Sequence, residues 1–91
     1  MKKPTKKQID AEIKLLKEYK TKVPRGTMSD NRASIDAQIW VLETQATNDN
    51  IYDRYTDDDR DANIRCEASD TMDWMNGEKK ERPSVGWKEL L

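Results

Sequence analysis

Apolar residues recur along the chain at helical spacing, in two segments that share one pattern. Ile9, Ile13 and Leu16 stand at positions i, i+4 and i+7, which places them on one face of a helix. The sequence IDAEIKLLKE of residues 9–18 returns 26 residues later as IDAQIWVLET, residues 35–44. The second apolar stripe consists of Ile35, Ile39 and Leu42. The repeat therefore predicts two amphipathic helices, each with one apolar stripe that needs a cover.

Signals for helix ends surround these stripes. Thr5 and Gln8 fit a capping box at the start of the first helix, and Ser29 or Asp30 is a suitable N-cap for the second. Between the two helices, residues 23–26 (VPRG) interrupt the helical pattern. Two helices with so short a connection are expected to form an antiparallel hairpin.

Further helices are predicted between residues 47 and 76. One starts near residues 47–48, and Thr56 with Asp59 forms a second capping pair, so two short helices or one unbroken helix over 48–76 would fit. In either case a weaker apolar stripe runs to a stop at Asn76-Gly77. This stripe consists of Ile64, Ala68, Met72 and Met75. We therefore predict an all-α fold, an antiparallel helical hairpin covered by one or two further helices as a small three- or four-helix bundle.

The last thirteen residues differ from the rest. Pro83-Ser84 is a helix-start signal, and Trp87, Leu90 and Leu91 follow at i, i+3 and i+4. Such a face either lies in a groove of its own bundle or serves as a linear motif for another molecule. The predicted organisation is a helical bundle over residues 1–78 and a tail with a short docking helix or linear motif over 79–91.

Composition limits the chemistry that the chain can perform. Of the 91 residues 34% are hydrophobic and 38% charged, so the core is thin. There is no histidine and Cys66 is the one cysteine, which excludes Ser-His-Asp and Cys-His catalysis, cysteine metal clusters and an intrachain disulfide. We expect no enzyme activity and no cofactor. The chain shows no secretory or membrane-spanning apolar run, so we expect a cytoplasmic protein that does not associate with membranes.

An alternation of carboxylates in the middle of the chain suggests a calcium loop. Asp57, Asp59 and Asp61 are spaced like the first ligands of an EF-hand. The sixth position of that loop is Ala62 where a glycine is required, and the twelfth is Ala68 where a bidentate glutamate is required. We therefore predict no metal site, and helix capping explains these acids better.

Charge is segregated although the net charge is only −1. Residues 1–32 carry ten Lys/Arg and four Asp/Glu, residues 33–78 carry three and twelve, and residues 79–91 carry four and two. The acidic middle is expected to meet a partner protein with a basic surface. Trp40 replaces Lys14 in the repeat and lies beside the apolar stripe, where it either packs against a further helix or anchors a partner. The predicted partner-binding residues are Trp40, Asp59, Glu67, Asp70, Asp73 and Trp87.

Two alternatives remain open. The lysines at the start of the chain could bind a nucleic-acid backbone. These are Lys2, Lys3, Lys6 and Lys7. A homodimer is a further expectation, because apolar stripes too poor to be buried within one copy can be buried between two.

Several strings give the chain a family resemblance. IDAQIWVLE, DNIYDRY, the acidic run, MDWMNGE and PSVGWKELL together resemble small helical phage and prophage proteins, mostly without assigned function. The resemblance implies an accessory protein that acts by binding, such as an inhibitor that blocks a host protein. It implies no functional residue, because the shared strings are stripes and caps.

Overall fold

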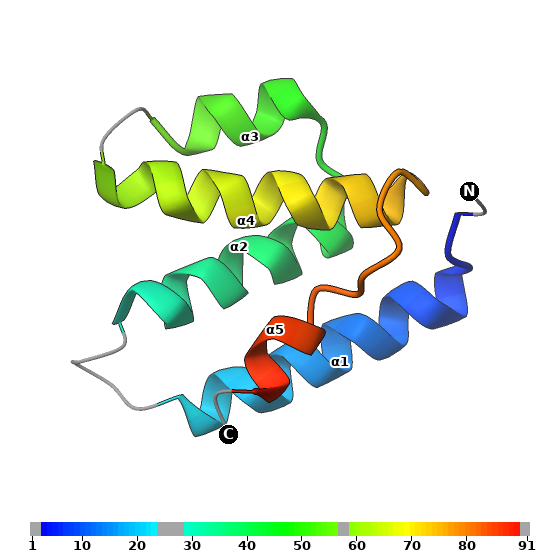
Figure 1. Ribbon diagram of the computed structural model, residues 1–91. Coiled ribbons are helices and arrows are strands. Elements are labelled where there is room, and N and C mark those ends of the chain that lie inside the picture. The colour runs from blue at the N-terminus through cyan, green and yellow to red at the C-terminus, as the bar shows by residue number, and fades with distance from the viewer. Residues whose placement is uncertain (1–2, 24–28, 57–58, 90–91) are drawn as a thin grey trace.

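A computed structural model describes residues 3–23, 29–56 and 59–89. In these ranges the chain forms helices and no strand (Figure 1), which confirms the predicted all-α bundle. The helices are α1 (Lys6–Lys22), α2 (Ser29–Thr44), α3 (Asn48–Arg54), α4 (Asp59–Met75) and α5 (Val85–Lys88).

The two repeated segments form α1 and α2, which run side by side in opposite directions (Figure 1). Leu16 of α1 and the stripe of α2 lie in the core, while Ile9 and Ile13 are only half-buried. The predicted antiparallel hairpin is therefore present, and the second stripe is better covered than the first. The cover comes from α4, because α2 packs more extensively against α4 than against α1.

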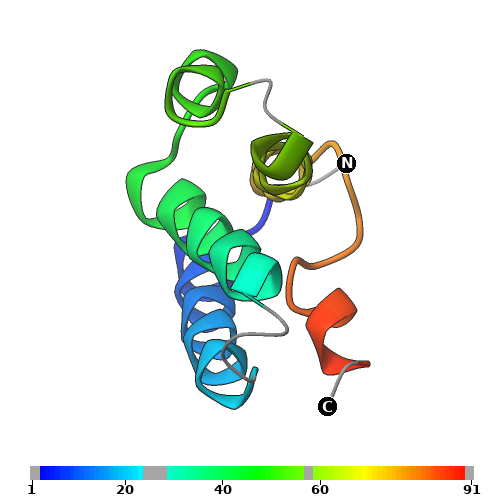
Figure 2. The ribbon, with the colours of Figure 1, turned by 90° about the vertical axis from the view of Figure 1, so that its left-hand side faces the viewer.

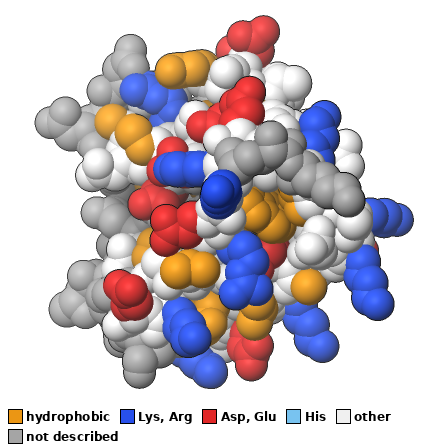
Figure 3. Space-filling view, turned by 45° about the vertical axis from the view of Figure 1, so that its right-hand side comes forward, with side chains coloured by type: hydrophobic (Ala, Val, Ile, Leu, Met, Phe, Trp, Pro, Cys, Tyr) orange, Lys and Arg blue, Asp and Glu red, His pale blue; other side chains and the backbone are white. Residues whose placement is uncertain are grey.

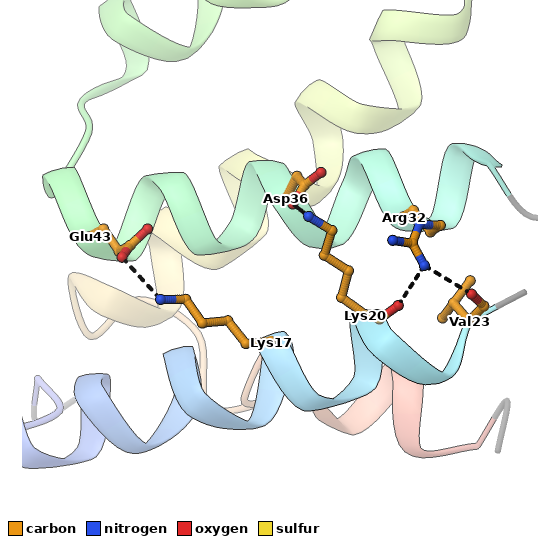
Figure 4. A network of polar contacts seen from close by, with 6 residues as sticks. All are labelled: Lys17, Lys20, Val23, Arg32, Asp36 and Glu43. Carbon is orange, nitrogen blue, oxygen red and sulfur yellow. Dashed lines mark hydrogen bonds and ion pairs between the residues drawn. The ribbon is translucent and has the colours of Figure 1, made fainter. Parts of the chain in front are cut away.

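Polar contacts hold the hairpin at its outer edge (Figure 4). Lys17 pairs with Glu43 at 3.4 Å, and Lys20 pairs with Asp36. The guanidinium of Arg32 donates hydrogen bonds of 2.9 and 3.1 Å to two carbonyl oxygens at the end of α1. The contacts of Lys20 and Arg32 fix the end of α1 against the first half of α2, and the Lys17–Glu43 pair joins α1 to the last turn of α2. Residues 24–28, with most of the predicted chain break, lie outside the described ranges.

Of the two arrangements predicted for residues 48–76, the structure shows two helices, α3 and α4, and not one unbroken helix. The chain leaves helical geometry at Tyr55, whose φ of −118° and ψ of 116° are extended, and α4 begins at Asp59. The Thr56 hydroxyl donates to Asp61 Oδ2 at 3.1 Å. The predicted pairing of Thr56 with Asp59 involves a side chain outside the described part of the chain. The break lets α3 fold back beside α4 (Figure 2).

Several helix ends follow the local sequence. Thr5 and Gln8 form the predicted capping box, with hydrogen bonds of 2.8 and 3.2 Å. Gly77 has a φ of 83°, and its N–H donates to the Trp74 carbonyl at 3.1 Å while the next N–H reaches the Asp73 carbonyl at 2.8 Å. This Schellman motif needs the left-handed backbone that glycine adopts freely, and it ends α4 at the predicted stop. All four residues of the predicted α4 stripe are buried.

The C-terminal tail returns to the bundle. The Trp87 side chain is 8% exposed, and its indole N–H donates to Gln38 Oε1 at 2.7 Å. The Ser84 backbone N–H donates to Oε2 of the buried Glu12 at 3.2 Å. Of the two predicted roles for the tail, the structure therefore shows a docking helix on its own bundle. Leu90 and Leu91 lie outside the described residues.

Candidate interaction surfaces

Trp40 is half-buried under a contact from its own chain. The Arg54 guanidinium carbon lies 4.7 Å from the centroid of the Trp40 ring. The Tyr55 ring meets it edge-on, with the centroids 6.0 Å apart. The expectation that a further helix packs on this flank is confirmed, with α3 and its C-cap in that role. The part of the indole available to a partner is correspondingly small.

Trp87 does not fit its predicted role as a partner-binding residue. An indole that is 8% exposed, with its N–H bonded to Gln38, offers little surface to another protein. The physical reason is the thin core: burying one more tryptophan gains more than leaving it in water. In the sequence, Trp87 belongs to an apolar helix face. The same face is expected for a helix that docks on its own bundle and for a linear motif that binds another protein, so the sequence does not separate the two roles.

The predicted carboxylates of α4 do not form one continuous surface. Asp70 is exposed and pairs with Lys79 Nζ at 3.0 Å. Glu67 is half-buried and accepts a long hydrogen bond of 3.4 Å from Gln38 Nε2, beside the Trp87 contact. Asp73 is half-buried one turn after Asp70, and the Asp59 side chain lies outside the described part of the structure. Glu67 and Asp70 therefore make contacts within the chain, and the four predicted carboxylates do not act as one binding surface.

Burial makes Glu67 responsive to pH. Desolvation raises the pKa of its carboxyl above the ordinary value of 4.5, the Asp70 charge raises it further, and Lys79 opposes both. A carboxyl whose pKa is raised by folding contributes stability below its unfolded pKa, and that contribution is lost as pH rises through the folded pKa. The ionised Glu67 side chain therefore weakens the fold at neutral pH.

We predict that Glu67→Gln raises the free energy of unfolding at pH 7, because the amide keeps an acceptor for Gln38 and carries no charge. The gain is on the order of a few tenths of a kcal/mol, since the side chain is only partly buried. Thermal melts at pH 4.5 and pH 7 measure it, with exposed Glu18→Gln as the matched control. A Glu67→Gln variant less stable than wild type at pH 7 contradicts the prediction.

A groove of about 1090 Å³ opens between the first half of α1 and the C-terminal ends of α2 and α4. Its apolar residues come from α1, from α2 with the residue that follows it, and from α4. They are Ile9, Ile13, Leu42, Ala46, Met72 and Met75. The two isoleucines of α1 are half-buried, whereas their counterparts in the repeat, Ile35 and Ile39, are buried. The groove is therefore the part of the first stripe that the bundle leaves uncovered.

Acidic residues dominate the edge of this groove. Five carboxylates and two ammonium groups line it. The carboxylates are Asp10, Glu43, Asp49, Asp73 and Glu78. Lys3 and Lys6 are the cations. Of the five acids, Asp73 alone was predicted as a partner-binding residue, because the others come from helices and turns that only the tertiary fold brings together.

The predicted nucleic-acid lysines are exposed where they are described. Lys3, Lys6 and Lys7 lie at the start of α1, and Lys2 is outside the described residues. Cys66 is exposed on α4. Across residues 3–23, 29–56 and 59–89, no group of three or more Cys, Asp or Glu side chains is placed to hold a metal ion, and no helix is long and apolar enough to cross a membrane.

Comparisons with protein-family models, with curated proteins and with solved structures find no match to this chain. The resemblance to phage and prophage proteins therefore stays a prediction.

Proposed function

We propose that this protein is a non-enzymatic interaction module that binds a helix of a partner protein in the groove between α1, α2 and α4. The partner helix has an apolar face that enters the groove and basic residues that meet its acidic edge. The observation that carries the proposal is the half-buried pair Ile9 and Ile13, which form one wall of the groove together with acidic neighbours.

The apolar part of the groove suits a helix. Helices bind in such grooves through anchors at i, i+3 or i+4, and i+7, which need a trough lined by side chains from more than one element. Ile9 and Ile13 line this one together with Met72 and Met75, which are 7% and 8% exposed, so the two isoleucines offer the larger apolar surface. Methionine side chains adapt their shape to different apolar neighbours, so the buried α4 residues beneath can adjust when a partner side chain packs on the isoleucines.

The acidic residues of the groove favour a partner helix with positive charge. Within the described ranges, Asp10, Asp49 and Glu78 form no ion pair, so their charges are available to a ligand. Glu43 is held by Lys17. Acids around an apolar trough favour lysine or arginine beside the apolar face of a partner and repel acidic helices.

A module of this kind can act as an inhibitor. A partner helix held in the groove is no longer available to its own target, and one copy of the protein blocks one copy of the partner. This is the activity that the resemblance to phage accessory proteins implies, and a cytoplasmic setting in a host cell suits an exposed free cysteine such as Cys66.

Designed peptides test the proposal directly. One amphipathic helical peptide carries lysines beside its apolar face, and a second carries glutamates there. We expect the lysine peptide to bind and the glutamate peptide not to bind, measured by calorimetry. Chemical-shift changes in ¹⁵N and methyl NMR spectra are expected at Ile9, Ile13, Met72 and Met75.

Charge reversal at the groove edge supplies the specific variant. Asp10→Lys with Asp49→Lys should weaken lysine-peptide binding by about tenfold or more, because each reversal replaces an attraction with a repulsion. Glu18→Lys with Asp53→Lys changes the net charge equally at exposed sites away from the groove and should have little effect. Equal affinity for the two peptides, or equal losses in the two double variants, would show that the groove is not the binding site.

A further inference from the structure

Basic residues that are far apart in the sequence meet at a second cleft. Lys3 precedes α1, whereas Lys79, Lys80 and Arg82 follow α4, and all four line a cleft of about 690 Å³. The cleft lies along α1, with Trp74 of α4 among its walls. Figure 3 shows apolar surface bordered by Lys and Arg side chains, with Asp and Glu side chains among them, on the face that its view brings forward.

The charge of this cleft is positive. Glu12 is the one carboxylate among the described residues that line it. Its side chain is 2% exposed, and its two oxygens are taken by the Ser84 N–H at 3.2 Å and Arg82 Nε at 3.7 Å. Lys79 pairs with Asp70 outside the cleft. Lys3 and Lys80 make no ion pair in the described part of the chain, so their charges face solvent.

The segment that carries three of these cations is anchored at both ends. The Schellman motif at Gly77 fixes its start, and the contacts of Ser84 with Glu12 and of Trp87 with Gln38 fix its end. Between them, the Lys79–Asp70 pair adds a third contact. Cations on a fixed segment lose little conformational freedom when they bind an anion, which favours binding.

We propose that this cleft binds the phosphate backbone of a single-stranded nucleic acid. The positive surface continues beyond the cleft, because Lys6 and Lys7 are exposed on the first turn of α1 next to Lys3. A strand with a phosphate at every nucleotide can use such a continuous row of point charges. Between the cations, Pro4, Ala11 and Leu15 give the cleft an apolar lining against which the sugars and bases of a strand can pack, while Trp74 beneath it is 7% exposed. Lys3 also lines the acidic groove proposed above, whereas Lys79, Lys80 and Arg82 line this cleft and not that groove.

Fluorescence anisotropy with a labelled oligo(dT) of about 12 nucleotides tests this inference. We expect binding at about 50 mM salt that weakens steeply toward about 200 mM. Lys3→Glu with Lys80→Glu should reduce the affinity by about tenfold or more and flatten the salt dependence, since two phosphate contacts are lost. Both side chains are exposed, so the fold should survive, which circular dichroism checks.

Lys14→Glu with Lys22→Glu is the matched control. It changes the net charge of the protein by the same amount, at exposed positions that do not line the cleft. We expect this variant to bind oligo(dT) nearly as wild type does. Equal losses in the two double variants, no binding at low salt, or equally tight binding of an oligo-glutamate peptide would each overturn the inference. The acidic-groove variant Asp10→Lys with Asp49→Lys should keep its oligo(dT) binding, so the two proposals can fail separately.

Discussion

Replacing Trp87 with alanine is expected to lower the free energy of unfolding by about 3–5 kcal/mol. The substitution removes a side chain that is 8% exposed, leaves a cavity between α5 and the bundle, and takes the donor from Gln38 Oε1. Small domains are stable by only about 5–15 kcal/mol, so this is a large part of the total. Urea denaturation followed by circular dichroism measures the loss.

Trp87→Phe separates packing from hydrogen bonding. Phenylalanine keeps most of the apolar contact but leaves Gln38 Oε1 without its 2.7 Å donor, so we expect a smaller loss of about 1–3 kcal/mol. This variant also remains informative if the alanine variant does not fold. Unchanged stability in Trp87→Ala would mean that the tail does not dock as the structure has it.

The repeat offers a second large effect with an internal control. Ile35 and Ile9 occupy equivalent positions, yet Ile35 is fully buried and Ile9 is half-buried at the groove. Ile35→Ala is therefore expected to cost about 2–5 kcal/mol, because a cavity forms in a packed core. Ile9→Ala should cost about 1 kcal/mol or less, since the removed atoms already lie next to solvent.

Denaturant titrations of the two isoleucine variants under the same conditions give this comparison. Equal losses would mean that the groove beside α1 is closed in solution, and the proposed helix-binding function would lose its site. The expected asymmetry would show that one half of the repeat builds the core while the other half leaves a binding surface.

Local signals in the sequence predicted the helices well. Caps such as Thr5 with Gln8, and the stop at Gly77, depend on residues a few positions apart, so they can be read directly from the sequence. Apolar stripes at helical spacing were also reliable, because they reflect which face each helix must bury. The break between α3 and α4 was left undecided, since the tyrosine-rich stretch before it suits a helix as well as a turn.

The sites were harder to predict, because they depend on contacts between distant segments. Glu12 looks like one more charged residue of an exposed helix face, and it is buried only because Ser84, 72 residues away, donates to it. Gln38 likewise gains its role from Trp87, 49 residues away. Trp40 and Trp87 were predicted to bind a partner, and both contact their own chain, because a sequence does not distinguish an indole that binds a partner from one that binds its own chain.

The docked tail has a consequence for how the chain is made. Because α5 closes over α1 and α2, a ribosome releases the start of the bundle long before it releases the segment that satisfies Glu12 and Gln38. During that interval the nascent bundle exposes a carboxylate and an amide that later become internal. In a chain that ends before Ser84, the Glu12 carboxylate and the Gln38 amide would stay exposed. We expect cellular proteases to degrade such a truncated chain faster than the full-length protein.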